Sequence, residues 1–191
     1  ELYEGVELPP IPHPQKPDSP STWHGSGEFM KYQRWGKDPR KDQAFADDVR
    51  RHYAACVSYV DDHVGMLIEK LKATGAADNT VIVLWGDHGW HLGEHAIWGK
   101  HALFEESLHA PLIVVAPEVK EPGLPASAVV ETVDIFPTLC ELTGLGTPDF
   151  ATGTSLLPML QDPTMPGHSA VAYTGGAKTI RTERYRYIAH K

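Results

Sequence analysis

Apolar residues recur at three- and four-residue steps from Val49 to Leu71, the spacing that places side chains on one face of an α-helix. Ahead of this stretch, Asp38-Pro39 combines a capping carboxylate with a proline suited to the first turn of a helix. Behind it, Gly75 is the residue type that commonly ends helices. The pattern therefore predicts one long amphipathic helix between Asp38 and Gly75.

Two short runs of continuous apolar residues, 81–85 and 111–116, are typical of strands buried on both faces of a sheet. Helical periodicity returns over residues 132–143 and ends at Gly144. Further short strands are expected over residues 168–174, 179–182 and 184–189. The order of helix, buried strand, loop, buried strand and helix predicts an α/β fold, with a mixed, largely parallel sheet flanked by helices.

The start of the chain has a different character from the rest. Residues 1–39 are rich in proline and lack sustained periodicity, so they are expected to form an irregular segment covering an α/β core portion at residues 40–191. Ordered packing is favoured over a disordered linker, because a linker has little use for aromatic side chains. The segment carries Trp23, Phe29, Tyr32 and Trp35.

The composition of the chain argues against some classes of binding partner. A formal net charge of −8 argues against a general nucleic-acid binder, because phosphate backbones are held by surplus lysine and arginine. No apolar run approaches the roughly twenty residues that span a bilayer, and the first residues do not resemble a signal peptide. Cys56 and Cys140 lie in apolar periodic segments, which predicts buried thiols rather than a disulfide.

Candidate chemistry begins where the run 81–85 ends, at Asp87 and His88. In open α/β sheets, ligands bind outside the carboxyl ends of strands. A carboxylate beside an imidazole in that position is a common pair of ligands for a divalent cation. Gly86 and Gly89 permit a sharp turn of the backbone around the pair. The alternative is that the two side chains merely cap a turn.

The loop that follows is dense in titratable and aromatic side chains. Lys100 can place an ammonium on a tetrahedral anion, although an exposed solubilising lysine is the alternative. His91 and His95 have the four-residue spacing of zinc ligands on a helix. Gly93 and the lack of a glutamate directly after His91 favour a supporting hydrogen-bonding role for both. His109 is expected to be structural.

Several segments match, in order, the motifs of a known family. They are Gly-Asp-His-Gly-Trp-His-Leu-Gly-Glu-His from residue 86, Trp98-Gly-Lys100, Phe104-Glu105, His109-Ala-Pro111, Val133-Asp134-Ile-Phe-Pro137 and Ile180-Arg-Thr182. On these segments the chain resembles the sulfatases of the alkaline-phosphatase superfamily, most closely the iduronate-2-sulfatase-like group. The resemblance extends from about Asp42 onward and implies part of an alkaline-phosphatase-like sandwich.

The resemblance also implies roles for individual residues. Asp87 and His88 would coordinate the divalent metal, which is calcium in most sulfatases. Lys100 would contact the sulfate as the catalytic residue. The side chains expected to line the substrate crevice are Trp90, Trp98 and His95.

The chain departs from the family at the nucleophile. Family sulfatases use a formylglycine made from a Cys/Ser-x-Pro-x-Arg segment, and neither Cys56 nor Cys140 is followed by that pattern. Proline comes one place too late after Ser155 and one place too early after Ser19. We therefore expect a partial sulfatase catalytic domain that lacks the N-terminal half with the nucleophile and the extreme C-terminus. Such a chain is expected to be inactive by itself.

The function implied for the parent enzyme is a sulfuric-ester hydrolase acting on a sulfated small molecule or glycan, with no nucleic-acid or membrane partner. The same likeness implies an extracytoplasmic location. One alternative is a phosphodiester or phosphonate-ester hydrolase, since such enzymes of the superfamily share the Asp-His-Gly and lysine arrangement. The other is a noncatalytic binding module that keeps the fold without the nucleophile.

Overall fold

The computed structural model describes residues 2–18, 23–117, 119 and 122–191, so the Ser19-Pro20 pair lies outside the described residues. The chain forms two compact units, each assembled from two stretches of sequence. The first unit consists of Glu1–Ala77 and His88–His109, and the second unit of Asp78–Asp87 and Ala110–Lys191. The chain therefore passes from the second unit back to the first between Asp87 and His88.

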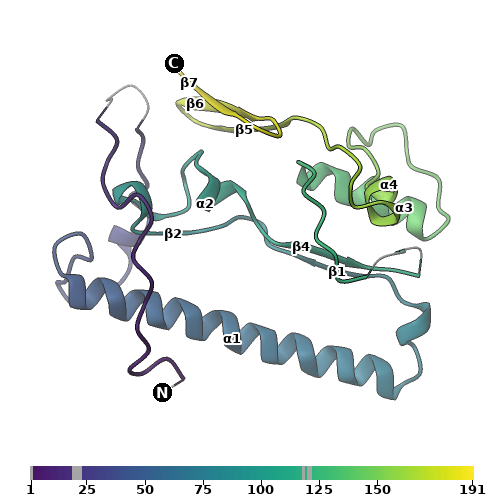
Figure 1. Ribbon diagram of the computed structural model, residues 1–191, viewed down its shortest axis with the longest axis horizontal. Coiled ribbons are helices and arrows are strands. Elements are labelled where there is room, and N and C mark those ends of the chain that lie inside the picture. Colours follow the sequence, from purple (N-terminus) through teal and green to yellow (C-terminus); the bar gives the residue numbers. More distant parts are fainter. Residues whose placement is uncertain (1, 19–22, 118, 120–121) are drawn as a thin grey trace. The chain divides into compact units, whose positions relative to one another are not determined.

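The first unit contains a helix of 31 residues, α1 (Gln43–Ala73), drawn in blue in Figure 1. The Asp42 carboxylate caps it by accepting a hydrogen bond from the Phe45 N–H at 3.0 Å. The prediction that the helix starts at Asp38 is wrong, because that carboxylate instead binds the Arg40 guanidinium at 2.7 Å within a preceding turn. Two aspartates one helical turn apart offered competing caps, and the second is the one used.

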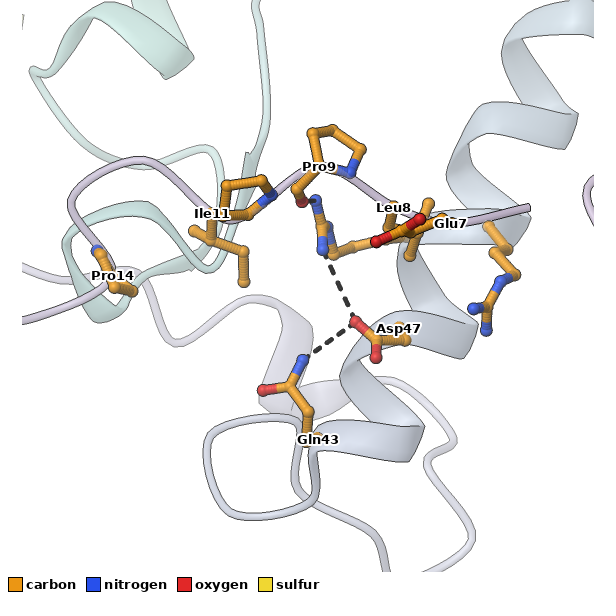
Figure 2. A pocket seen from close by; sticks show the side chains of 10 residues that line it. Glu7, Leu8, Pro9, Ile11, Pro14, Gln43 and Asp47 are labelled. Carbon is orange, nitrogen blue, oxygen red and sulfur yellow. Dashed lines mark hydrogen bonds and ion pairs between the residues drawn. The ribbon is translucent and has the colours of Figure 1, made fainter. Parts of the chain in front are cut away.

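The proline-rich start of the chain packs along α1 in the first unit. The Tyr3 hydroxyl is hydrogen-bonded to the Ser58 hydroxyl at 2.7 Å, and the Arg50 guanidinium donates to the Pro9 carbonyl. The two segments line a cavity of about 460 Å³, and Asp47, labelled in Figure 2, lies on its wall. Arg50 also lines this cavity and forms an ion pair with Asp47 at 3.5 Å. These contacts show that Tyr3 and Pro9 of the covering segment are bound to α1.

The second stretch of the first unit is a short antiparallel hairpin followed by one helical turn. Its elements are β2 (His91–Leu92), η3 (Glu94–Ala96), β3 (Trp98–Gly99) and α2 (Glu105–Leu108). The turn η1 (Phe29–Lys31) of the covering segment contacts this hairpin, with the Phe29 ring 5.7 Å from the Trp98 ring. Trp35, by contrast, is 75% exposed, so not every aromatic side chain of the segment is packed.

The second unit contains two antiparallel sheets and a helical layer. After the turn η2 (Ala77–Asn79), β1 (Ile82–Trp85) pairs with β4 (Leu112–Val115). A meander at the end of the chain comprises β5 (Ala170–Thr174), β6 (Ala177–Arg181) and β7 (Arg186–His190). In the sequence, three helical elements lie between β4 and β5. They are η4 (Thr132–Asp134), α3 (Ile135–Leu142) and α4 (Leu157–Gln161).

The predicted ends of the two main helices are confirmed. Gly75, with φ of 71°, follows α1, and Gly144, with φ of 69°, follows α3. Both glycines adopt the left-handed conformation that residues with a Cβ rarely reach. Among the described residues, none of the helices combines the length and the apolar character needed to cross a membrane.

The direction of strand pairing differs from the prediction. All strand pairs found among the described residues are antiparallel, so the expected largely parallel sheet is wrong for these strands. Continuous apolar runs indicate burial and do not encode direction, which depends on the path of the connection. The runs are also less buried than expected, since Trp85, Ile113 and Val115 are each 51–55% exposed. Cys56 is exposed and Cys140 buried, both as free thiols.

A buried aspartate ties the helical layer of the second unit to its final sheet. Asp134 is 1% exposed, and its two carboxylate oxygens accept hydrogen bonds from the Thr154 N–H at 2.8 Å and the Glu131 N–H at 2.7 Å. The His168 Nε2 lies 2.7 Å from the same carboxylate. Glu131 in turn accepts a hydrogen bond from the Val171 N–H of β5. One charge therefore joins three segments that are distant in sequence.

Candidate active site

The predicted metal ligands Asp87 and His88 follow β1 directly, where the chain passes between its two units. Asp87 is exposed and His88 is half-buried. Just before the pair, the Gly86 N–H donates to the Pro111 carbonyl at 2.9 Å, which extends the β1–β4 pairing to the base of the loop. The pair thus begins where regular strand pairing ends, as the sequence predicted. Coordination of one metal by both side chains stays a prediction.

The tautomer of His88 suits a metal ligand. Its Nδ1 lies 2.9 Å from the Gly89 carbonyl oxygen, which can only accept a hydrogen bond. Nδ1 therefore carries the proton of the neutral ring, and Nε2 carries the lone pair that a metal requires. Within the described part of the chain, however, no three histidine, cysteine, aspartate or glutamate side chains are grouped as metal ligands. A carboxylate and an imidazole fit part of a metal site and do not complete one.

His91 occupies the buried centre of the hairpin. It is fully buried, its Nδ1 is hydrogen-bonded to the Ser107 hydroxyl at 2.9 Å, and its Nε2 lies 3.3 Å from the Glu106 carboxylate. Burial lowers the pKa of His91 and outweighs the opposing effect of Glu106, so the neutral ring is favoured. The His95 Nε2 lies 3.6 Å from the same carboxylate. Both rings thus have protein partners, which favours the supporting role over the zinc alternative.

His95 is held among aromatic rings. Its ring stacks on Phe104 at 4.6 Å and lies parallel to His13 at 6.0 Å. Its backbone has φ of 55°, and the N–H donates to the His13 carbonyl while the carbonyl accepts from Trp23 Nε1 at 2.8 Å. These bonds maintain an uncommon left-handed backbone. Direct contact of His95 with a substrate stays a prediction.

Lys100 and Trp90 lie together in the first unit, whereas Trp98 is separated from the surface. The Lys100 Nζ is 5.9 Å from the centroid of the Trp90 ring, and the Lys100 side chain is 28% exposed. Trp98 is 3% exposed and belongs to the core of the hairpin. An ammonium next to an aromatic face can bind an anion and the apolar group attached to it.

Glu28 and Tyr32 of the covering segment lie beside Lys100 and Trp90, although no motif in the sequence marks them as site residues. The Glu28 carboxylate lies 3.4 Å from Lys100 Nζ and 3.3 Å from His101 Nε2. The Tyr32 hydroxyl donates to Glu28 at 2.8 Å, and its ring is parallel to Trp90 at 6.4 Å. Partial burial acts to raise the pKa of Glu28. The Tyr32 hydroxyl and the Lys100 ammonium together have a larger, opposite effect, so the pKa of Glu28 is below its ordinary value.

Gly89 is required by the close approach of two backbone segments in the first unit. Its N–H donates to the Ser107 carbonyl at 2.9 Å, and a Cβ at this position would overlap the carbonyl oxygen of Glu106. Gly89→Ala is therefore expected to destabilise the protein by about 2 kcal/mol, because the loop beside His88 must move away. Chemical denaturation measures the change.

Gly65→Ala is the matched control for this substitution. Gly65 lies inside α1 with nothing within 4 Å of the added methyl group. The same chemical change should there stabilise the helix by up to about 1 kcal/mol. Equal stability of Gly89→Ala and the unmodified protein would show that the contact with Glu106 is not fixed.

Comparison with known proteins gives consistent matches. The family model described as Sulfatase matches residues 12–145. A sulfatase of Formosa agariphila is 38% identical over 141 residues, which cover 73% of this chain and 28% of that protein. Human iduronate 2-sulfatase is 35% identical over 128 residues, covering 54% of this chain and 23% of its own length. The chain thus spans about a quarter of the length of these relatives.

Two solved structures are similar in fold. One, a complex with its substrate D-glucosamine-2-N,6-O-disulfate, has a TM-score of 0.68 at 30% identity, covering 75% of this chain and 32% of that chain. The other, the phosphonate monoester hydrolase of Agrobacterium radiobacter, has a TM-score of 0.62 at 27% identity, covering 76% of this chain and 34% of that chain.

Proposed function

The chain belongs to the sulfatase family, and on that basis we propose that the protein hydrolyses sulfate esters, with Lys100 as its contact to the sulfate group. The observation that supports this proposal best is the position of the Lys100 ammonium, 5.9 Å from the Trp90 ring in the segment that directly follows Asp87 and His88. Family membership and similar solved structures also confirm the predicted α/β class of the alkaline-phosphatase superfamily.

In this proposal the chain contributes one wall of the reaction site. Lys100 donates an N–H to a sulfate oxygen and stabilises the negative charge that develops on the ester oxygen as the S–O bond breaks. Trp90 covers the apolar side of the group that carries the ester. Sulfatases generally use a divalent metal and formylglycine. Asp87 and His88 are the side chains proposed to hold the metal, with calcium as the ion.

The proposed substrate class is a sulfated sugar of the glycosaminoglycan type. Two similar proteins support this choice, namely the one solved with D-glucosamine-2-N,6-O-disulfate and human iduronate 2-sulfatase. An extracytoplasmic location is part of the same proposal, because it follows from the likeness to this group of enzymes. The pocket that selects among sugars depends on loop residues, which fold similarity does not transfer.

Rates on an aryl sulfate and on the matching aryl phosphodiester test the proposed reaction. The full-length protein that contains this chain is expected to show kcat/KM at least about tenfold higher for the sulfate. The reverse preference would favour a phosphodiester or phosphonate-ester hydrolase, which the similarity to the Agrobacterium radiobacter enzyme makes the second candidate. If the protein hydrolyses neither ester, the result would favour the hypothesis of a noncatalytic binding module.

A further inference from the structure

The ammonium of Lys100 has a carboxylate partner contributed by a segment far away in the sequence. One oxygen of Glu28 lies 3.4 Å from Lys100 Nζ and accepts a hydrogen bond from the Tyr32 hydroxyl at 2.8 Å. The other oxygen faces His101 Nε2 at 3.3 Å. Glu28 has a side chain only 15% exposed, whereas that of Lys100 is 28% exposed. The carboxylate therefore lies on the more buried side of the pair.

The covering segment is held against β3, the strand that ends just before Lys100, by close packing at Gly99. Gly99 has φ of 127°, and a Cβ there would meet the Ser26 hydroxyl at 2.5 Å and the Glu28 Cβ at 3.4 Å. A glycine is thus what allows the segment to lie directly over residue 99. The contact places Glu28 next to the residue that follows Gly99 in the chain, which is Lys100.

Aromatic packing supports the same arrangement. The Tyr32 hydroxyl donates to Glu28 while the Tyr32 ring lies parallel to Trp90, the ring nearest the ammonium. Phe29, the residue after Glu28, packs on Trp98 in the hairpin core. Two aromatic side chains that follow Glu28 in the segment are therefore packed in place, and the orientation of the carboxylate does not depend on the ion pair alone.

We propose that Glu28 is a positioning residue for Lys100, an inference that rests on the proposed function of Lys100 as the sulfate contact. An ammonium has three N–H donors. A carboxylate on the buried side engages one of them and restrains a long, flexible side chain, so that the remaining donors face the exposed side. The orientation of Lys100 is thereby fixed before an anion binds.

The same carboxylate has an opposing effect on anion binding. A sulfate on Lys100 lies close to the negative charge of Glu28, and the two anions repel each other across the shared ammonium. His101, which faces the second oxygen of Glu28, offsets this repulsion only when its ring is protonated. Loss of the Glu28 charge should therefore strengthen the binding of sulfate while weakening the catalytic placement of Lys100. A side chain with only a structural role would weaken both.

Glu28→Gln in the full-length protein separates these two effects. The variant keeps the shape of the side chain and removes its charge. Inorganic sulfate, measured by isothermal titration calorimetry, should bind about threefold more tightly than to the unmodified protein. With an aryl sulfate, kcat should fall about tenfold because the lysine is less well placed. Glu28→Asp, which keeps the charge, should retain the sulfate affinity of the unmodified protein.

Glu69→Gln is the matched control. Glu69 forms an exposed ion pair with Lys72 at 2.9 Å on α1, and its neutralisation should change neither measurement. Weaker sulfate binding together with lower kcat in Glu28→Gln, or no change in either, would overturn the positioning role. Absence of sulfate binding by the unmodified protein would overturn both this inference and the proposed sulfate contact. Sulfate binding without ester turnover would count against the proposed reaction, while the affinity comparison still decides the role of Glu28.

Discussion

Lys100→Ala in the full-length protein is expected to lower kcat/KM for an aryl sulfate by about 100- to 1000-fold. This is the loss found when a single donor that stabilises developing oxyanion charge is removed from a hydrolase. The Lys100 side chain is 28% exposed, and its truncation removes the ion pair with Glu28 and the approach of the ammonium to the Trp90 ring. Little change in thermal stability should accompany the loss of activity.

Lys72→Ala provides the comparison for this substitution. Lys72 lies on α1, where it pairs with Glu69 at 2.9 Å and is 60% exposed. Both variants remove an ammonium from an ion pair, but only the change at Lys100 should affect hydrolysis. Steady-state kinetics with thermal unfolding as a folding check measure the difference. Activity of Lys100→Ala within about threefold of the unmodified protein would exclude a role for Lys100 in stabilising the leaving oxygen.

The two main helices and the strands β1, β4, β5, β6 and β7 could be predicted from sequence because their signals are local. The short elements β2, β3, α2 and α4 were not predicted, because they are too short to show a hydrophobic period. Hydrophobic spacing indicated both main helices, and Gly75 and Gly144 marked their ends through backbone geometry that few other residues accept. The start of α1 was predicted at Asp38 instead of Asp42, because both residues carry a carboxylate able to cap a helix. The direction of strand pairing was predicted incorrectly, because it depends on the path of the connections between strands. A run of apolar residues contains no information about that path.

In the candidate site, too, some residues could be predicted from local sequence and others could not. Lys100 and Trp90 could be found from a single short segment, and the structure brings their side chains together. Glu28 could not, because a glutamate in an irregular proline-rich segment gives no periodic or motif signal. What brings it to Lys100 is the missing Cβ of Gly99, which lets the covering segment approach. This contact depends on the tertiary path of the chain rather than on local sequence.

Asp134→Ala is expected to destabilise the second unit by about 2–5 kcal/mol, because two N–H groups lose their buried acceptor at a cost of about 1–3 kcal/mol each. The carboxylate is 1% exposed, and its loss leaves the N–H groups of Glu131 and Thr154 without their acceptor and His168 without its anion. Asp134→Asn should have an intermediate effect, because an amide can still accept one of these hydrogen bonds. Chemical denaturation of the protein measures both changes.

Asp162→Ala is the exposed counterpart, since Asp162 accepts hydrogen bonds from the Thr164 N–H and hydroxyl in a surface turn. It should lower the free energy of unfolding much less than Asp134→Ala does.

The pH dependence of stability tests the ion pair between Asp134 and His168 itself. The Ser169 carbonyl, Asp134 and Glu131 together raise the pKa of His168 above its usual 6.5 against the effect of partial burial. A raised pKa means that the folded state holds the proton more tightly, so this stabilisation is complete below about pH 6.5 and disappears as the pH rises through the folded-state pKa. In Asp134→Ala that decline in stability with rising pH should shrink. An undiminished decline would show that the Ser169 carbonyl and the Glu131 carboxylate account for it without Asp134.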